Sequence, residues 1–229
     1  PEFSIIVNMP EGTAMPDTAN VPLALAAAVR RIPEVTAVQT YAGTAQPFNF
    51  NGMVRHYYLR QRTWEGDLLV MLVDKDDRER GSHEIAVAAR AILKPIADRM
   101  GARIAVVEMP PGPPVLDTVV ATVYGPDAGT RRQVATDMRA MFDAVEDLVD
   151  TDTYMTDKHE YWRFEVATEK AVRLGVSVDT INGILAMSMG GYRLGDIKRG
   201  TVLEPTYIII QVPLTIRSQL SRLGDLPIP

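Results

Sequence analysis

The chain has 229 residues, 46% of them hydrophobic and 23% charged, which is the balance of a folded globular protein rather than a disordered one. No apolar run reaches the roughly 20 residues that span a bilayer, and a net charge of −5 without a basic cluster argues against a nucleic-acid partner. Cysteine is absent, which removes disulfides, thiolate metal sites and cysteine nucleophiles. The first residues, PEFSIIVNMP, lack a signal-peptide pattern, and neither chain end resembles a natural terminus, so we expect an excised fragment.

The first half of the chain alternates between strand and helix patterns. Asp17 or Thr18 is expected to cap a helix that Pro33 stops, and Ser82 to cap a second helix that Pro95 kinks or ends early. The expected strands are Phe3–Asn8, Glu34–Ala42, Met53–Arg60 with Asp67–Val73 as a possible continuation, and Arg103–Glu108. The expected apolar stripes are Val21, Leu25, Ala28, Val29 and Ile32 on the first helix, and Ile85, Ala89, Ile92, Leu93 and Ile96 on the second. The order βαββαβ predicts a ferredoxin-like unit, in which two helices cover one face of an antiparallel sheet.

A proline-rich stretch, PPGPP at 110–114, then predicts an extended linker and a domain boundary. After it the pattern restarts: RIPEVTAVQTY, ending at Tyr41, is matched by AVEDLVDTDTY, ending at Tyr154. This weak repeat favours a duplicated unit, although any two βαβ halves share such a pattern. The second copy is expected to contain strands at Asp117–Tyr124, Val149–Met155 and Tyr161–Val166, and a helix whose stripe is Val134, Met138, Met141, Phe142, Val145 and Leu148.

The end of the chain does not complete the second copy in a simple way. A helix opens at Thr168–Leu174, Gly175 breaks it, and Ser177 can cap a further helix that Gly190 and Gly191 close. A purely local interpretation makes TYIIIQV, 206–212, the missing fourth strand and leaves GYRLGDIKRGTVLEP as a loop.

The stretch FEVATEKAVRLGVSVDTINGILAMSMGG, 164–191, resembles the resistance-nodulation-division family of efflux permeases, of the acriflavine-resistance type. NMPEGTAMPDT, EVTAVQTYAG and VATVYGPD agree with the same family, so the resemblance covers nearly the whole chain. The residues of the stretch 164–191 that carry the resemblance are Glu169, Lys170, Ala171, Leu174, Gly175, Val176, Ser177, Asp179, Ile181, Asn182, Leu185, Gly190 and Gly191.

The resemblance implies an α+β fold with two ferredoxin-like porter subdomains side by side and a partial docking extension. Residues 1–109 would be the first porter subdomain, 115–175 the first part of the second, and 176–229 the start of the docking subdomain, where TYIIIQV would be a docking strand. This would be the second periplasmic loop of a proton-driven inner-membrane pump whose membrane helices lie outside the fragment. The implied partners are two sister protomers of a homotrimer, a periplasmic adaptor protein, an outer-membrane channel and small-molecule export substrates.

The loop AGTAQPFNFNGM, 42–53, is the best candidate for a substrate site, because a loop this long between adjacent antiparallel strands is often functional. The resemblance implies that the matching loop of drug exporters borders and gates the substrate pocket. The candidate substrate-binding residues are Phe48, Phe50, Asn51, Met53 and Tyr58. Met53, His56 and Tyr58 are expected to share one face of the strand that follows the loop. The alternative is that the phenylalanines fold back onto the sheet.

No metal or cofactor is expected to reside in the protein. His56, His83 and His159 lack metal-ligand spacing, and DKDDRERGSHE at 74–84 lacks the glycine that a calcium loop needs at its sixth position. Met53 and the other methionines raise a soft-metal substrate as an alternative, since thioethers suit Cu(I), although most of them fall on helix stripes. No nucleophile elbow, phosphate loop or placed carboxylate pair is present, so we expect no enzyme. A stand-alone tandem ferredoxin-like binding protein is the remaining alternative.

Overall fold

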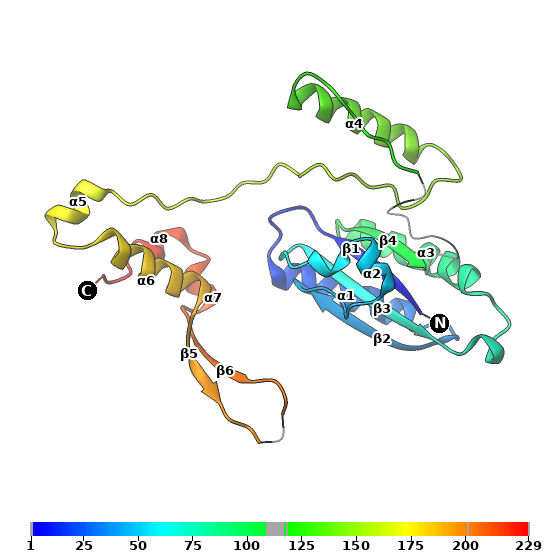
Figure 1. Ribbon diagram of the computed structural model, residues 1–229, viewed down its shortest axis with the longest axis horizontal. Helices are drawn as coiled ribbons and strands as arrows, with labels where there is room; N and C mark the ends of the chain where they lie inside the picture. Colours follow the sequence, from blue (N-terminus) through cyan, green and yellow to red (C-terminus); the bar gives the residue numbers. More distant parts are fainter. Residues whose placement is uncertain (1, 109–116, 118, 201, 229) are drawn as a thin grey trace. The chain divides into compact units, whose positions relative to one another are not determined.

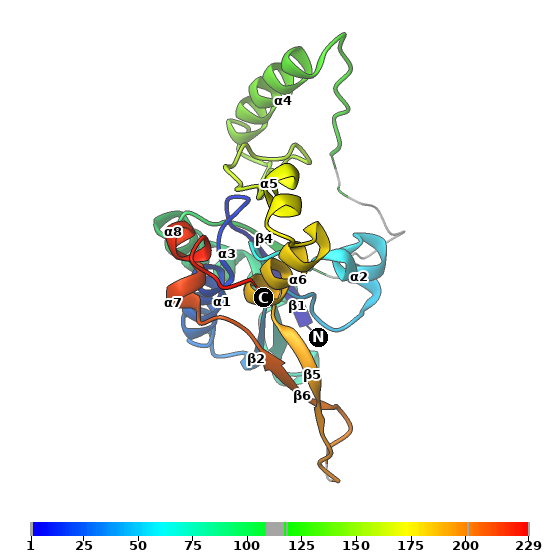
Figure 2. The same cartoon turned by 90° about the vertical axis from the view of Figure 1, so that its left-hand side faces the viewer.

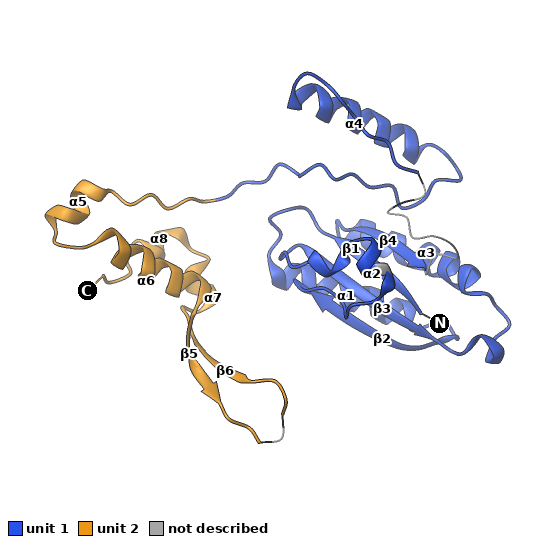
Figure 3. Cartoon of the chain, viewed as in Figure 1, with its two compact units in different colours: residues 1–161 blue, residues 162–229 orange. Residues whose placement is uncertain are grey.

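A computed structural model describes residues 2–108, 117, 119–200 and 202–228, and the predicted linker, 110–114, lies outside these residues. The chain divides into two compact units, 1–161 and 162–229 (Figure 3). The first unit begins with a four-stranded antiparallel sheet in the order β2-β3-β1-β4 (Figure 1). Its strands are β1 (Glu2–Asn8), β2 (Val35–Ala42), β3 (Glu65–Leu72) and β4 (Arg103–Glu108).

Two helices pack against one face of this sheet, α1 (Met15–Val29) and α3 (Ser82–Arg99). Between the sheet and these helices lies the core, which includes Phe3, Ile5 and Val7 of β1 and alternate residues of β3. The stripe predicted for α1 is entirely buried: Val21, Leu25, Ala28, Val29 and the following Ile32 all lie in the core. The first half of the chain therefore has the predicted βαββαβ order.

The helix ends differ from the sequence predictions. Ala14 rather than Asp17 or Thr18 occupies the N-cap of α1, and Gly81 rather than Ser82 occupies that of α3. α3 also continues through Pro95 to Arg99 instead of ending early. Burial of the neighbouring residues Leu93 and Ala97 in the core offsets the backbone hydrogen bond that the proline removes.

The third strand of the sheet is also displaced from its predicted position. Met53–Arg60 is not a strand: it lies in α2 (Phe50–Val54), the short 3-10 helix η1 (Tyr57–Leu59) and the turns around them. The possible continuation, Asp67–Val73, falls instead on the interior strand β3, which pairs with both β1 and β2. The run LLVML in β3 buries more apolar surface than the polar segment before it, which explains why β3 takes an interior place in the sheet.

The second copy of the unit is not formed within the described residues. Between 117 and 166 they form one helix, α4 (Ala128–Asp143), and the strands predicted at Asp117–Tyr124, Val149–Met155 and Tyr161–Val166 are wrong for this structure. No residue of α4 is buried, and Tyr124 and Tyr154 are 86% and 89% exposed. The alternating pattern predicts the tendency of a segment to form a strand, but the strand forms only when a hydrogen-bonding neighbour is present.

The second unit is a small assembly of short helices and one hairpin. It contains α5 (Thr168–Arg173), α6 (Val178–Gly190), the paired strands β5 (Tyr192–Ile197) and β6 (Thr206–Ile210), α7 (Leu214–Arg217) and α8 (Leu220–Leu223). The hairpin projects from the end of α6 (Figures 1 and 2). TYIIIQV therefore pairs with the segment predicted to be a loop, and does not add a fourth strand to a porter sheet.

The two ends of α6 follow the sequence prediction closely. The Ser177 hydroxyl oxygen accepts a hydrogen bond from the Thr180 N–H at 3.0 Å and caps the first turn. Gly191 has φ +83° and ψ 157°, a conformation open almost only to glycine. A Cβ at this position would lie 2.7 Å from the Ile209 Cγ2 atom of the hairpin. The double glycine thus allows the chain to turn directly from a helix into a strand.

Candidate functional site

The candidate loop belongs to a longer insertion between β2 and β3, and both ends of this insertion are fastened to Asp67. Asp67 is fully buried on β3. The Gln46 backbone N–H donates to Asp67 Oδ2 at 3.3 Å, and Arg60 Nε donates to Asp67 Oδ1 at 2.8 Å. One carboxylate therefore holds the start and the end of the segment 46–60, which we call the aromatic segment.

Arg60 extends this anchor across the end of the sheet. Its Nη1 donates to Asn8 Oδ1 at 2.8 Å, and its Nη2 donates to the carbonyl oxygen of Val7 at 2.7 Å. On the other side, the Ser4 hydroxyl donates to Gln46 Oε1 at 3.1 Å. Burial raises the pKa of the Asp67 carboxyl above its ordinary value, and the charge and hydrogen bonds of Arg60 oppose that rise. The network joins β1, β3 and both ends of the aromatic segment.

Between these anchors the aromatic segment exposes a group of large apolar side chains. Phe48 and Tyr58 have ring centroids 5.9 Å apart, and the His56 ring lies 6.0 Å from that of Tyr58. The exposed members are Phe48 at 68%, Phe50 at 44%, Met53 at 46%, Tyr58 at 41% and Leu59 at 66%. The phenylalanines therefore do not fold back into the core, and a fixed support presents them to solvent.

The local shape of the segment differs from the strand that the sequence predicted. The Asn49 side chain accepts the Gly52 N–H at 2.7 Å and starts the helix α2. His56 then takes a left-handed backbone conformation with φ 57°, so Met53, His56 and Tyr58 do not share a strand face. Asn51 lies in α2, and its side chain is outside the described part of the structure. A turn-and-helix signal, Asn followed by Gly three residues later, stands in the sequence where the prediction placed only a loop.

A polar contact joins the aromatic segment to the start of the second half of the chain. Arg55 Nη1 lies 2.9 Å from Asp117 Oδ1 in an ion pair whose side chains are 21% and 47% exposed. Burial raises the pKa of the neighbouring Tyr57 hydroxyl, and the charge of Arg55 opposes that rise. The segment thus combines exposed aromatic groups with a guanidinium that is already paired.

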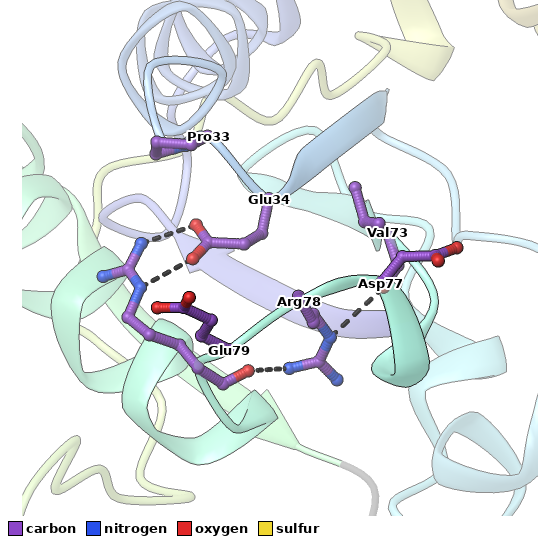
Figure 4. Close-up of a pocket in the computed structure, with 7 residues that line it drawn as sticks. Pro33, Glu34, Val73, Asp77, Arg78 and Glu79 are labelled. Carbon is purple, nitrogen blue, oxygen red and sulfur yellow. Dashed lines mark hydrogen bonds and ion pairs between the residues drawn. The ribbon is translucent and has the colours of Figure 1, made fainter.

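The charged loop 74–81 forms a hollow beside the start of β2, with a volume of about 420 Å³ (Figure 4). Both of its arginines have hydrogen-bond partners within the fold. Arg80 pairs with Glu34 through two hydrogen bonds of 2.7 and 2.5 Å, and Arg78 donates to the carbonyl oxygens of Val73 and Arg80 and to the Ser82 hydroxyl. Within the described residues, no three His, Asp or Glu side chains gather in a metal-binding group. We interpret the hollow as a structural corner of the fold.

The Glu34–Arg80 pair predicts a pH dependence of stability. Hydrogen bonding to Arg80 lowers the pKa of the Glu34 carboxyl from its ordinary value of 4.5. A lowered pKa in the folded state contributes stability above the ordinary pKa, and this contribution is lost as the pH falls through the folded-state value. Denaturant unfolding is expected to show that the free energy of unfolding falls more steeply for the wild type than for Glu34→Gln as the pH is lowered from about 5 to about 3. Parallel pH profiles of the two proteins would contradict the assignment.

The sequence prediction missed the residues that build the support. Asp67, Gln46 and Arg60 were not candidates, because each is ordinary in isolation. A signal for Asp67 was available: it is a lone carboxylate beside the apolar run LLVML, and a charge in a buried strand requires a partner. Nothing in the sequence pattern indicates that the partner is Arg60, seven positions earlier.

Comparison with known proteins decides the family. The sequence pattern of the AcrB/AcrD/AcrF family matches residues 2–229. The chain belongs to this family. AcrB/AcrD/AcrF proteins are inner-membrane efflux transporters of the resistance-nodulation-division type, so this chain is part of a transporter and not of an enzyme, as the sequence predicted.

Solved structures agree with the family at the level of the fold. Two crystal forms of a heavy metal efflux pump superpose with TM-scores of 0.69 and 0.70 at 19% sequence identity, covering 99% and 98% of this chain. The chain spans 23% of the length of each of those chains. No curated protein matches it. Within the described residues of this AcrB/AcrD/AcrF-family chain, no helix is both long and apolar enough to cross a membrane.

Proposed function

We propose that the chain is the second periplasmic porter region of a proton-driven multidrug efflux permease. Residues 1–109 form the first porter subdomain in this proposal, 115–175 begin a second ferredoxin-like subdomain, and 176–229 enter a docking subdomain that carries the β5–β6 hairpin. The region lies on the periplasmic face of the inner membrane. Its partners are sister protomers of a homotrimer, a periplasmic adaptor protein and an outer-membrane channel.

The observation that carries the proposal is the exposed aromatic group on its buried support. Phe48, Phe50 and Tyr58 offer apolar and π surface to solvent, while Gln46 and Arg60 fix the ends of their segment on Asp67. Aromatic side chains on a fixed support bind apolar and variable ligands at a low entropic cost. We therefore assign small apolar or amphipathic compounds as the substrates, with Phe48, Phe50, Asn51, Met53 and Tyr58 as contact residues.

A metal-ion exporter is the second candidate function. The pump whose two crystal forms match the fold is a heavy metal efflux pump, and Met53, a residue of the aromatic segment, is 46% exposed. Thioethers suit soft ions such as Cu(I) and Ag(I). In this case Met53, rather than the phenylalanines, would determine which substrates are exported.

Drug susceptibility of cells that carry the intact pump tests the proposal. With Phe48→Ala and Phe50→Ala combined, the lost ring contacts are expected to weaken export of bulky apolar compounds by about tenfold. Ile92→Ala is the matched control, since Ile92 is also an exposed apolar residue, 41% exposed, but lies on α3. Equal pump levels in the membrane confirm that folding is unaffected.

The same cells separate the two candidate functions when they are exposed to silver and copper salts. Multidrug export predicts that Met53→Ile leaves silver tolerance unchanged, and that the double phenylalanine variant loses drug tolerance. If Met53→Ile abolishes silver tolerance while the phenylalanine variant behaves like the wild type, the metal exporter replaces our proposal.

A further inference from the structure

Two side chains cap the backbone of one residue at an edge of the four-stranded sheet. The strand order places β4 at one end of the sheet, where an edge strand normally presents unpaired N–H and C=O groups. At Val106 both outward groups have partners. The Val106 N–H donates to Asp150 Oδ2 at 2.9 Å, and the Val106 carbonyl oxygen accepts from Arg90 Nη2 at 3.2 Å.

Arg90 and Asp150 are also paired with each other. Arg90 Nε lies 3.1 and 3.0 Å from the two carboxylate oxygens of Asp150, and Nη2 lies 2.8 Å from Oδ2. Only 17% and 13% of the two side chains are exposed. The pair therefore supplies the acceptor and the donor that a neighbouring strand would supply. We call this arrangement, Arg90 and Asp150 with the backbone of Val106, the edge latch.

Asp150 reaches this position through an unusual backbone conformation. Its φ is 56°, in the left-handed region, which aspartate and asparagine tolerate better than most residues. Chain segment 150–159 then continues beside the first sheet with weaker contacts. Asp152 Oδ2 accepts a hydrogen bond from Asn8 Nδ2 at 3.3 Å. Arg103 Nε lies 3.6 Å from Asp152 Oδ1, and Arg103 Nη1 lies 3.7 Å from Asp157 Oδ2. These contacts are more exposed, so the edge latch is the strongest attachment of the segment.

We propose that the edge latch is a positioning device that fastens the second half of the porter region to the edge of the first sheet. Through it, Asp150 fixes segment 150–159, whose His159 ring lies 6.0 Å from the ring of Trp64, four residues after the end of the aromatic segment. Release of the latch frees segment 150–159 and uncovers the backbone of Val106. The consequence for transport rests on the proposed function, whereas the latch itself can be tested on the chain alone.

Backbone amide hydrogen exchange of the 229-residue chain, resolved by residue, is the direct test. Asp150→Ala removes the acceptor, and the exchange of the Val106 amide is expected to accelerate by about tenfold or more. Because amides alternate in direction along an edge strand, Ala105 and Val107 donate to β1 and are expected to stay protected. Asp152→Ala, a matched loss of a carboxylate two residues further on, is expected to leave Val106 protected.

Two further variants separate the latch from a general gain of stability. Asp150→Asn keeps an oxygen acceptor and a tolerance for the left-handed conformation. The exchange rate of its Val106 amide is therefore expected to lie between those of the wild type and Asp150→Ala. The exchanged pair, Arg90→Asp with Asp150→Arg, restores opposite charges but leaves the Val106 N–H without its carboxylate, so Val106 is expected to remain unprotected. Three results would each contradict the edge latch. They are an unchanged exchange rate of the Val106 amide in Asp150→Ala, an equal acceleration of all β4 amides, and full recovery of Val106 protection in the exchanged pair.

Transport by the intact pump then tests its consequence. Asp150→Ala is expected to reduce export of the same compounds that depend on Phe48 and Phe50, while Asp152→Ala is not. Loss of Val106 protection with unchanged export would refute the positioning role and leave the proposed function in place. Failure of the phenylalanine variants to change export would instead refute the proposed function and leave the amide result untouched.

Discussion

Replacement of Asp67 by alanine is expected to lower the free energy of unfolding by about 3–5 kcal/mol. The Asp67 side chain is fully buried and receives the Arg60 guanidinium and the Gln46 backbone N–H. Its loss removes the closer carboxylate from a guanidinium that is only 12% exposed and leaves only the Glu65 carboxylate, 3.8 Å from Arg60 Nη1. Breaking one side of a buried pair costs far more than the pair contributes, because the remaining charge stays desolvated. Denaturant unfolding, with one midpoint and an unchanged slope, measures the loss.

The matched control for Asp67 is another aspartate in an ion pair. Asp98 pairs with Lys94 one helical turn away on α3, with both side chains more than half exposed. Asp98→Ala is expected to change stability by less than about 0.5 kcal/mol, since solvent screens such pairs. A similar loss of unfolding free energy for Asp67→Ala and Asp98→Ala would mean that Asp67 is not the buried anchor of the aromatic segment. The aromatic rings would then have no fixed support, and the site would need another explanation.

The two helices of the first sheet and the strands β1, β2 and β4 could be predicted because short-range patterns specify them. β4 has the predicted bounds, and β1 and β2 differ from theirs by one residue. The helix stripes were assigned to the correct face, although Ile92 of α3 is 41% exposed while its neighbour Leu93 is buried. Periodicity gives the direction of the buried face, but its width depends on what packs against it.

The sequence groups the candidate residues on one segment between β2 and β3, but it does not show how that segment is built. Phe48, Phe50, Met53 and Tyr58 are exposed on this segment, and their role in substrate binding stays a prediction. The choice of β3 over Met53–Arg60 depended on which segment buries more apolar surface between β1 and β2, a comparison that alternation alone does not make. The support through Asp67 depends on contacts between residues on different elements, such as Ser4 and Gln46, which no local pattern encodes.

The second large effect on stability is expected at one of two leucines of α1, which differ in how they are packed. Leu25 is fully buried in the core and Leu23, two residues earlier, is 59% exposed. Leu25→Ala is expected to cost about 2–5 kcal/mol, because it removes buried methyl groups and leaves a cavity in the core between the helices and the sheet. Leu23→Ala makes the same chemical change in the same helix and is expected to cost less than about 0.5 kcal/mol.

Thermal or denaturant unfolding of the two leucine variants compares sites that share residue type, helix and intrinsic propensity, so their difference isolates burial. A large loss for Leu23→Ala would mean that its side of α1 is covered by another part of the protein. A small loss for Leu25→Ala would mean that the sheet and helices of the first unit do not enclose a packed core. In that case β3 would have no apolar layer beneath it, and Asp67 could not hold the aromatic segment in one position.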